Sequence, residues 1–466
     1  MSQGFEAEYK KKLISVQEAA QLVQSGDRLH LGGGANIATI IDRYVAQRKD
    51  ELQDVYFQTY IDTASYDMCA CDPEKQVFQW QSGFLLGPVR SLSKERGIGV
   101  YIPEAWHTAP DTYRNYLHFN KYYAVTSQMD AYGYFNFGLT TGHSKAISEV
   151  SDTVIAVVRK DMPTVFGGRE EGIHISDVDY IVEDDETETF CLPSIPIQNA
   201  DEMIAANILE AGLIQNGSTI QIGIGGLPNA VLESVKNAGI TDCGLHTEML
   251  TEKMLDLIEQ GVVTNKQKTM DKYKSVFTFA LGSSRLYQHI HKNPAFAAYP
   301  VNYTNHPTVI ARQPRMFSLN STAQIDLTGQ AASEQVPVRE RPLQISGTGG
   351  QLDFIMGAWL AEDGQGASVL SLYSTYKNES RIVPLLERGA NVTAPRSLVQ
   401  YVATEWGAVN LRGLSNTERA RALIAIAHPD FRDTLNREAE KLGVISYGKV
   451  PTNTKHVPGV VVSRDK

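Results

Sequence analysis

Glu248 is the residue whose type and place in the chain point most directly to chemistry. It ends a strand-like stretch, residues 243–248, just before a helix-like stretch, residues 251–258. In an open α/β sheet, side chains at the carboxyl ends of the strands face the ligand crevice, so this carboxylate is placed to act on a ligand. A glutamate beside a helix start also interacts favourably with the helix dipole. The pattern by itself leaves a catalytic and a purely structural interpretation open.

Two glycine-rich turns lie on either side of Glu248 in the sequence, at residues 223–228 and 347–351. A turn of this kind between a strand and a helix presents free backbone N–H groups and the positive end of the helix dipole to a bound anion. Two such turns in one half of the chain suggest a ligand with more than one polar group. Glycines that serve only the local turn geometry are the structural alternative.

The first turn departs from the dinucleotide-binding pattern. Pro228 stands where a third glycine is expected for close packing of helix and strand. Asp242 lies at about the downstream distance at which a carboxylate binds a ribose, so a dinucleotide site stays open as an alternative. Proline suits the first turn of a helix, where its missing N–H costs nothing. The turn is therefore still able to present N–H groups to an anion.

The four cysteines, Cys69, Cys71, Cys191 and Cys243, are too few and too scattered for a disulfide framework, so we expect thiols. Cys69 and Cys71 form the pair with the most metal-like spacing. The histidines, however, show no paired ligand spacing, and metal sites usually need three or four ligands. We therefore expect no metal site.

The overall charge and hydropathy exclude two classes of partner. The 466 residues carry a formal net charge of −10, and the longest basic run is the lysine triplet at residues 10–12, which argues against nucleic-acid binding. No apolar run approaches the roughly 18 residues of a transmembrane helix, and the first residues lack the basic-then-apolar order of a signal peptide. The sequence predicts a cytoplasmic protein with no membrane or nucleic-acid partner.

The elements that position Glu248 belong to an internal repeat. Residues 15–23 have helical spacing, residues 28–31 alternate as a strand, and a glycine turn at 32–34 leads into a second helix near residue 38. The same order of helix, strand, glycine turn and helix recurs 191 positions later, at 201–214, 219–222, 223–226 and 229–235. This repeat predicts an α/β fold made by tandem duplication, with two similar open α/β domains and mainly parallel sheets.

The two predicted domains meet at a connector rich in proline. Pro193 and Pro196 stiffen residues 192–196, which follow the acidic run at residues 183–186. We therefore expect an N-terminal domain at residues 1–192 and a C-terminal domain, which carries Glu248, at residues 197–446. Residues 447–466 show no periodicity, and we expect them to form a mobile tail.

Several motifs in order resemble those of the class I coenzyme A transferases of the acetyl-CoA hydrolase/transferase type. The resemblance runs from about residue 9 to residue 442 and is strongest to the 4-hydroxybutyrate and butyryl-CoA:acetate CoA-transferases. It is carried by residues 130–138, 172–176, 221–230, 245–249, 303–305, 349–354, 380–384 and 427–432. The resemblance implies two α/β domains of the NagB/RpiA type with the active site in the cleft between them.

The resemblance also implies roles for individual residues. Glu248 would be the nucleophile and would form a covalent thioester with coenzyme A in a ping-pong reaction. Asn136 and Gln221 would contact the acyl carboxylate. Contacts to coenzyme A would come from the two glycine turns and one lysine, namely Gly223, Ile224, Gly225, Gly226, Leu227, Gly349, Gly350 and Lys377.

The substrates implied by the resemblance are an acyl-CoA and a free short-chain carboxylic acid, such as acetate, butyrate or 4-hydroxybutyrate. Coenzyme A would be a substrate, with no permanently bound cofactor and no metal, and the enzyme would be a homodimer or higher homo-oligomer. Gly33 stands where the 4-hydroxybutyrate relatives carry histidine and the butyryl relatives carry a bulky aromatic residue. We expect this glycine to enlarge the acyl pocket or admit more water, and so to allow a bulkier or more polar acid.

Two rival functions remain. Water could attack the acyl species on Glu248, which would make the protein an acyl-CoA hydrolase on the same scaffold. Alternatively, the protein could bind coenzyme A or a dinucleotide without catalysis, in which case Glu248 would be dispensable. The dependence of acyl-CoA consumption on a carboxylate acceptor separates the transferase from the hydrolase, and binding without turnover identifies the non-catalytic protein.

Overall fold

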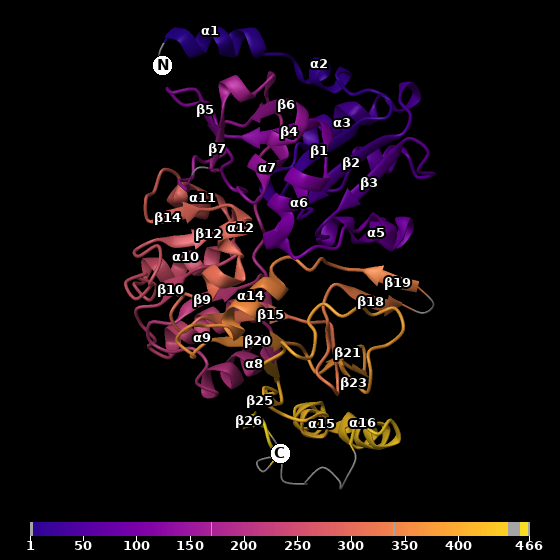
Figure 1. The fold of residues 1–466 in the computed structure, drawn as a ribbon, viewed down its shortest axis with the longest axis vertical. Coiled ribbons are helices and arrows are strands. Elements are labelled where there is room, and N and C mark those ends of the chain that lie inside the picture. The colour runs from indigo at the N-terminus through magenta and orange to yellow at the C-terminus, as the bar shows by residue number, and fades with distance from the viewer. Residues whose placement is uncertain (1–2, 169, 339–340, 446–456, 465–466) are drawn as a thin grey trace.

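The N-terminal half of the chain folds around a six-stranded parallel sheet (Figure 1). The computed structural model describes residues 3–168, 170–338, 341–445 and 457–464. The strand order is β3-β2-β1-β4-β6-β8, with bounds β1 (Arg28–Gly33), β2 (Val55–Tyr60), β3 (Phe78–Ser82), β4 (Phe119–Thr126), β6 (Ser151–Val158) and β8 (Tyr180–Glu183). The last five residues of β6 are buried β-branched and small side chains, as expected for a strand covered on both faces.

Helices cover both faces of this sheet. The chain enters through α1 (Gln3–Lys12) and α2 (Val16–Gln21), and a capping box between Ser15 and Glu18 starts α2. The other helices of this half are α3 (Thr39–Ala46), α4 (Asp67–Cys71), α5 (Arg90–Arg96), α6 (Ala109–Tyr116) and α7 (Ser144–Glu149). A short antiparallel pair, β5 (Tyr134–Asn136) and β7 (Gly172–His174), lies at the edge of this half.

The C-terminal half has a seven-stranded sheet of order β10-β9-β15-β20-β24-β25-β26. Its strands are β9 (Thr219–Ile222), β10 (Gly244–Leu245), β15 (Phe317–Ser321), β20 (Ala367–Ser371), β24 (Tyr401–Thr404), β25 (Gly407–Asn410) and β26 (Val460–Ser463). The first five strands are parallel, and β25 and β26 extend one edge in antiparallel fashion. The main helices are α8 (Asn199–Glu210), α9 (Gly226–Asn237), α14 (Gln351–Trp359), α15 (Asn416–Ala425) and α16 (Pro429–Lys441).

The C-terminal half also contains many smaller elements outside its main sheet. The elements between β10 and β15 in the chain are β11 (Met249–Leu250), α10 (Glu252–Glu259), β12 (Ser275–Phe277), β13 (Phe279–Ala280), α11 (Ser284–Ile290), β14 (Phe296–Ala298), α12 (Val301–Thr304) and α13 (Pro307–Ile310). The outer elements are β16 (Gln324–Asp326), β17 (Ala331–Ala332), β18 (Gln335–Val338), β19 (Arg341–Gln344), β21 (Thr375–Tyr376), β22 (Glu379–Ser380) and β23 (Ile382–Val383).

The predicted fold class is confirmed, and the repeated order of elements is present in both halves. In the first half α2, β1, a glycine turn and α3 follow one another, and in the second half α8, β9, a glycine turn and α9 do so. The predicted helix at 201–214 ends early, at Glu210, because Gly212 adopts a left-handed φ of 69° that stops it. The division into domains 1–192 and 197–446 stays a prediction.

The expectation of a mobile tail is wrong for its described strand. Residues 460–463 form β26, which pairs with β25, and Val462 is buried in the core. A four-residue strand is too short to show a periodicity in the sequence. Residues 446–456 and 465–466 lie outside the described residues.

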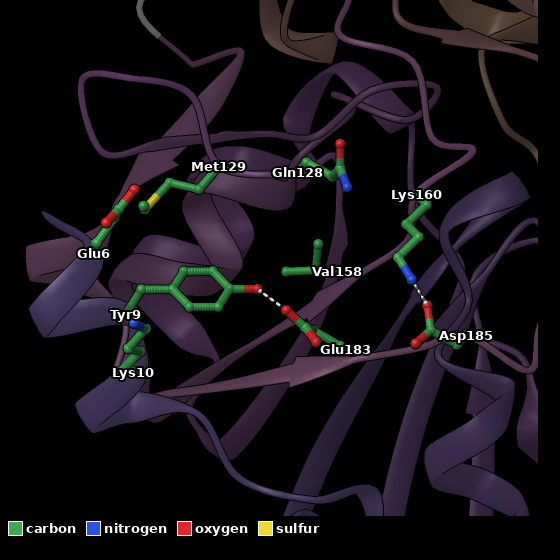
Figure 2. A pocket seen from close by; sticks show the side chains of 9 residues that line it. All are labelled: Glu6, Tyr9, Lys10, Gln128, Met129, Val158, Lys160, Glu183 and Asp185. Atoms are coloured by element: carbon green, nitrogen blue, oxygen red, sulfur yellow. Dashed lines mark hydrogen bonds and ion pairs between the residues drawn. The ribbon is translucent and has the colours of Figure 1, made fainter. Parts of the chain in front are cut away.

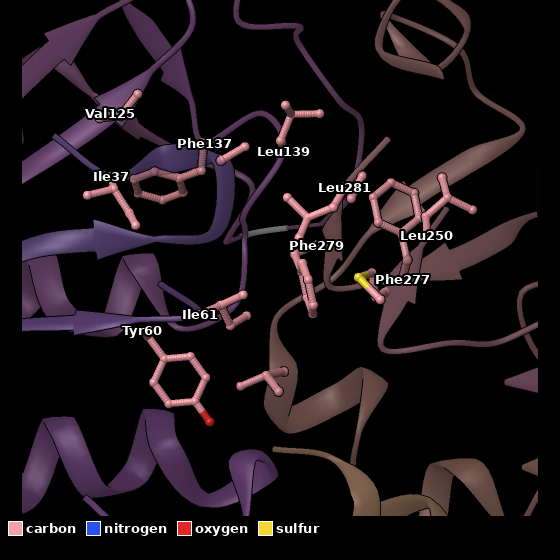
Figure 3. Close-up of a cluster of buried hydrophobic side chains, with 14 of the residues drawn as sticks. Ile37, Tyr60, Ile61, Val125, Phe137, Leu139, Leu250, Phe277, Phe279 and Leu281 are labelled. Carbon is pink, nitrogen blue, oxygen red and sulfur yellow. The ribbon is translucent and has the colours of Figure 1, made fainter. Parts of the chain in front are cut away.

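One hydrophobic core joins the two halves (Figure 3). From the N-terminal half it takes Ile37, Tyr60, Ile61, Val125, Phe137 and Leu139, and from the C-terminal half Leu250, Phe277, Phe279 and Leu281. The Phe279 ring packs edge-on against Trp106, with ring centroids 5.5 Å apart. The boundary between the two halves is therefore largely apolar in this region. None of the helices in the described ranges is long and apolar enough to span a membrane.

Candidate active site

Glu248 lies in the short segment between β10 and β11, at the carboxyl end of a parallel strand. Its backbone carbonyl accepts hydrogen bonds from the N–H groups of Thr278, at 3.0 Å, and Phe279, at 3.2 Å. Helix α10 begins only at Glu252, and that residue, not Glu248, is the acid in its first turn. The structural alternative, in which Glu248 serves the helix dipole, is therefore not supported.

The Glu248 side chain opens into a cleft of about 420 Å³ that both halves of the chain line. The apolar part of the wall near the interface consists of Ile61, Phe84, Leu86, Met249, Phe279 and Leu281. The polar part includes Gln221, Asn320, Ser321, Thr322 and Gln351. Among the described lining residues Arg90 is the single cationic side chain. The cleft thus combines one carboxylate, an apolar wall and uncharged hydrogen-bonding groups.

Ile61 shows that the wall of this cleft carries backbone strain. Its φ is 54°, a left-handed conformation that β-branched residues rarely adopt. The carbonyl of Ile61 accepts a hydrogen bond of 3.0 Å from Gly34 N–H, which holds the turn in place. Strained residues of this kind cluster at ligand sites.

Two N–H donors face the Glu248 carboxylate. Asn305 Nδ2 donates to Glu248 Oε2 at 2.6 Å, and the backbone N–H of Gly350 also bonds to the carboxylate. A Cβ at position 350 would overlap both Glu248 Oε2 and Asn305 Nδ2, so any other residue there would displace these two side-chain ends. The glycine turn therefore brings its backbone into direct contact with the carboxylate.

The pKa of Glu248 is raised to about 8. Burial is the main cause and the nearby Asp353 carboxylate adds to the rise, whereas the donors Asn305 and Gly350 act in the opposite direction. The ionised carboxylate is the nucleophilic form. Because the pKa is raised, the protonated form of Glu248 dominates below about pH 8.

If Glu248 is the nucleophile that the family resemblance implies, kcat/KM for an acyl-CoA should rise with pH and level off above about pH 8. Well below that value it should fall about tenfold for each pH unit. Initial rates measured from pH 5.5 to 9.5 test this expectation. A profile that is flat between pH 5.5 and 8 would contradict a titrating nucleophile with this raised pKa.

The first glycine turn meets the cleft only in part. Gln221, Gly223 and Ile224 line it, as does Pro228. The other three predicted residues of the turn do not line the cleft. Gly225 has a positive φ of 134° and serves the turn itself, Gly226 packs against the carboxylate of Asp201, and Leu227 is buried in the core. In the second turn Gly350 lines the cleft, and Gly349 lies beside the Phe84 ring and Glu248.

Asn136, Lys377 and Gly33 also lie outside the lining of the cleft. Asn136 is buried and its amide is used by the backbone: Nδ2 donates to Val165 O, and Oδ1 accepts from the N–H groups of Gly138 and Val165. Lys377 is exposed on the turn between β21 and β22, beside the Tyr376 ring.

The expected enlargement of the acyl pocket at Gly33 is wrong. A Cβ at position 33 would overlap the backbone carbonyl of Tyr60, so the missing side chain leaves no empty space. The pairing of β1 with β2 shifts register between His30 and Gly33, and this irregularity brings the two backbones together. Gly33 therefore serves the packing of the sheet.

Sequence reasoning missed Asn305 and Asp353 as site residues. Both are completely buried, and Asn305 Nδ2 lies within hydrogen-bond distance of both Glu248 and Asp353. Each belongs to a motif that carries the family resemblance, residues 303–305 and 349–354. Their place in these motifs was the signal available in the sequence.

A second hollow, of about 400 Å³, lies under α1 and away from Glu248 (Figure 2). Its polar groups are already paired in part, since Tyr9 donates to Glu183 at 2.9 Å and Lys160 lies 2.6 Å from Asp185. None of the predicted site residues lines it. The described residues also contain no group of three or more His, Cys, Asp or Glu side chains suited to a metal ion.

Comparison with known proteins places the chain in a family. The family model of the acetyl-CoA hydrolase/transferase N-terminal domain matches residues 1–193, and that of the C-terminal domain matches residues 282–439. A probable butyrate:acetyl-CoA coenzyme A-transferase from Syntrophomonas wolfei is 39% identical over 95% of this chain and 98% of its own. A butyryl-CoA:acetate CoA-transferase from Anaerostipes caccae is 37% identical over 94% of this chain and 98% of its own.

A solved structure is also similar over most of the chain. RipA from Yersinia pestis superposes with a TM-score of 0.83 at 33% identity, over 96% of this chain and 100% of RipA. The chain therefore belongs to the acetyl-CoA hydrolase/transferase family.

Proposed function

We propose that this protein is an acyl-CoA:carboxylate CoA-transferase that uses Glu248 as its nucleophile. The observation that carries the proposal is the Glu248 carboxylate itself, open to the cleft and bonded to Asn305 Nδ2 and Gly350 N–H. A carboxylate held by two N–H donors is suited to carry a covalent acyl or thioester group, because the same donors stabilise the negative oxygen that forms during attack.

The reaction proceeds by exchange of bonds at Glu248. A carboxylate oxygen of Glu248 attacks the thioester carbonyl, the C–S bond breaks, and a mixed anhydride and coenzyme A thiolate result. The thiolate then attacks Cδ of Glu248, and the acyl group leaves as a carboxylate with the bridging oxygen. A glutamyl-CoA thioester remains. A second carboxylic acid reverses both steps, so no net proton transfer and no ATP are needed.

Asn305 has a defined part in this sequence. Its Nδ2 lies 2.6 Å from Glu248 Oε2, the oxygen that becomes negative when the thiolate attacks Cδ. A fixed donor at such an oxygen contributes roughly 3–4 kcal/mol to transition-state stabilisation. Gly350 N–H is placed to support the same charge.

The cleft wall supports a short apolar acyl group as substrate. Ile61, Phe84, Met249 and Phe279 line the cleft together with Glu248, and butyrate-like chains bury well against such side chains. The names of the two similar transferases agree with this substrate class. Because the chain has a net charge of −10, attraction of anionic substrates depends on local N–H groups and Arg90.

A single assay separates the transferase from its two rivals. Butyryl-CoA should be consumed only when a carboxylate acceptor such as acetate is present, and acetyl-CoA should form in equal amount. Consumption at the same rate without an acceptor would identify an acyl-CoA hydrolase. Tight binding of acyl-CoA without turnover would identify a non-catalytic protein. Residence in the cytoplasm and assembly as a homodimer stay part of the proposal.

A further inference from the structure

Asn305 lies between two carboxylates. Its Nδ2 is 2.6 Å from Glu248 Oε2 and 3.3 Å from Asp353 Oδ2. Both Asn305 and Asp353 are completely buried. The other end of the amide, Asn305 Oδ1, has no hydrogen-bond partner among the described residues. The amide thus gives its donor end to two acceptors and leaves its acceptor end unpaired.

This arrangement selects one of two rotamers of Asn305. An asparagine amide has a donor end and an acceptor end of nearly equal size, and a rotation of 180° exchanges them. Rotation here would bring the carbonyl oxygen against two carboxylates, which accept hydrogen bonds but, when ionised, donate none. The repulsion disfavours the rotated form, so the N–H faces Glu248.

The two carboxylates are not equivalent during the proposed reaction. Glu248 loses its negative charge when it becomes an anhydride or a thioester, and its hold on the Asn305 amide then weakens. Asp353 takes no part in bond exchange and keeps its charge. At the stage when a donor is needed for the next tetrahedral intermediate, Asp353 is therefore the group that keeps the amide in the correct rotamer.

Asp353 is itself held from the other half of the chain. His107 Nδ1 lies 2.7 Å from Asp353 Oδ1, and the backbone N–H of His107 donates to Oδ2 at 3.1 Å. Asp353 also lies in the first turn of α14, where the helix dipole favours a negative charge. In the same contact region, the backbone N–H of Trp106 donates to the backbone carbonyl of Gly349 at 3.2 Å. The position of Asp353 thus depends on the packing of the two halves.

We propose that Asp353 is a positioning residue: it fixes the Asn305 amide with its N–H toward Glu248, and His107 holds Asp353 in place. The proposal rests on the proposed transferase function. Asp353 is not among the residues that line the cleft, so its effect on catalysis passes through Asn305, apart from its charge, which raises the pKa of Glu248. The comparisons below are therefore made at pH 9.5, where Glu248 is ionised with or without that charge.

The first test is Asp353→Asn. The substituted amide is able to donate as well as accept, so it no longer forbids the rotated form of Asn305. We expect kcat to fall on the order of 100-fold, as for the loss of one oxyanion donor. KM for acyl-CoA should stay within about threefold, because Asp353 makes no contact with the cleft. Asp111→Asn, the same change on the exposed surface of α6, is the matched control and should leave kcat unchanged.

A double-mutant comparison separates positioning from a general structural role. In an Asn305→Ala background there is no amide to orient, so adding Asp353→Asn should change kcat by less than about threefold. A further loss near 100-fold in that background would overturn the proposal, as would a kcat for Asp353→Asn within about threefold of the unmodified enzyme.

His107 offers an independent test if Asp353→Asn fails to fold. His107→Asn keeps a side-chain N–H near the position of Nδ1, whereas His107→Ala removes it. We expect kcat to fall on the order of tenfold in His107→Ala and to recover in His107→Asn. If both variants were as active as the unmodified enzyme, the proposal that His107 holds Asp353 in place would be overturned. Formation of a covalent coenzyme A adduct on Glu248 of the unmodified protein tests the proposed transferase function separately. Failure of the positioning role of Asp353 is therefore distinguishable from failure of the transferase function.

Discussion

Replacing Glu248 by alanine should reduce transfer of coenzyme A from butyryl-CoA to acetate by about 10⁴-fold or more, to the level of background. The alanine variant has no atom to attack the thioester, and neither Asn305 nor Gly350 supplies another nucleophile. Glu248→Asp keeps the charge but withdraws the carboxylate by one methylene from the two donors, so we expect a loss on the order of 100-fold. Steady-state rates at saturating substrate measure both effects.

The matched control for this pair is Glu202→Ala, which removes a carboxylate from the exposed surface of α8. It should retain full activity. Thermal melting of each variant checks that the fold is intact. Activity of Glu248→Ala within tenfold of the unmodified enzyme would remove Glu248 from the mechanism.

Gly350→Ala should also abolish most of the activity, for a steric reason. The backbone at position 350 has φ −91° and ψ 5°, which alanine adopts without strain. The added Cβ, however, would overlap Glu248 Oε2 and Asn305 Nδ2 and would push the carboxylate away from its donors. We expect kcat to fall on the order of 100-fold or more.

Gly99→Ala is the control for this substitution. A Cβ there meets no atom within 4 Å, and the position does not need a left-handed φ. It should leave both the activity and the melting temperature unchanged. If Gly350→Ala kept normal activity, the close contact between the glycine turn and Glu248 would have no part in catalysis.

The place of Glu248 was accessible from the sequence because it depends on local order. A strand of alternating or apolar residues, a turn and a helix follow one another along the chain, and the carboxyl end of a parallel strand is a ligand-facing position in any open sheet. The same local reasoning predicted α9 after β9 and the mainly parallel sheets.

The roles of Asn305, Asp353 and His107 were not accessible in this way. Asn305 is 57 residues from Glu248 along the chain, and His107 is 246 residues from Asp353. Only the packing of the two halves brings them together. Each residue type is also common as a buried structural residue, so the sequence alone gives no reason to join them into one site.

Gly33 shows a different limit. A glycine at a position where the family resemblance implies a bulky side chain suggests empty space, but the backbone carbonyl of Tyr60 occupies the space that a Cβ would need. The register shift of β1 brings the carbonyl of Tyr60 against the α-carbon of Gly33. Strand irregularities of this kind depend on contacts between strands, which a single sequence does not display.

The central claim is that coenzyme A becomes covalently bound to Glu248, and mass spectrometry of the digested protein tests it most directly. After incubation with butyryl-CoA and no acceptor acid, the peptide that carries Glu248 should gain the mass of coenzyme A less one water. The gain should be absent in Glu248→Ala and should disappear when acetate is added. Absence of any adduct under conditions that support transfer, or an adduct on another residue, would contradict the mechanism.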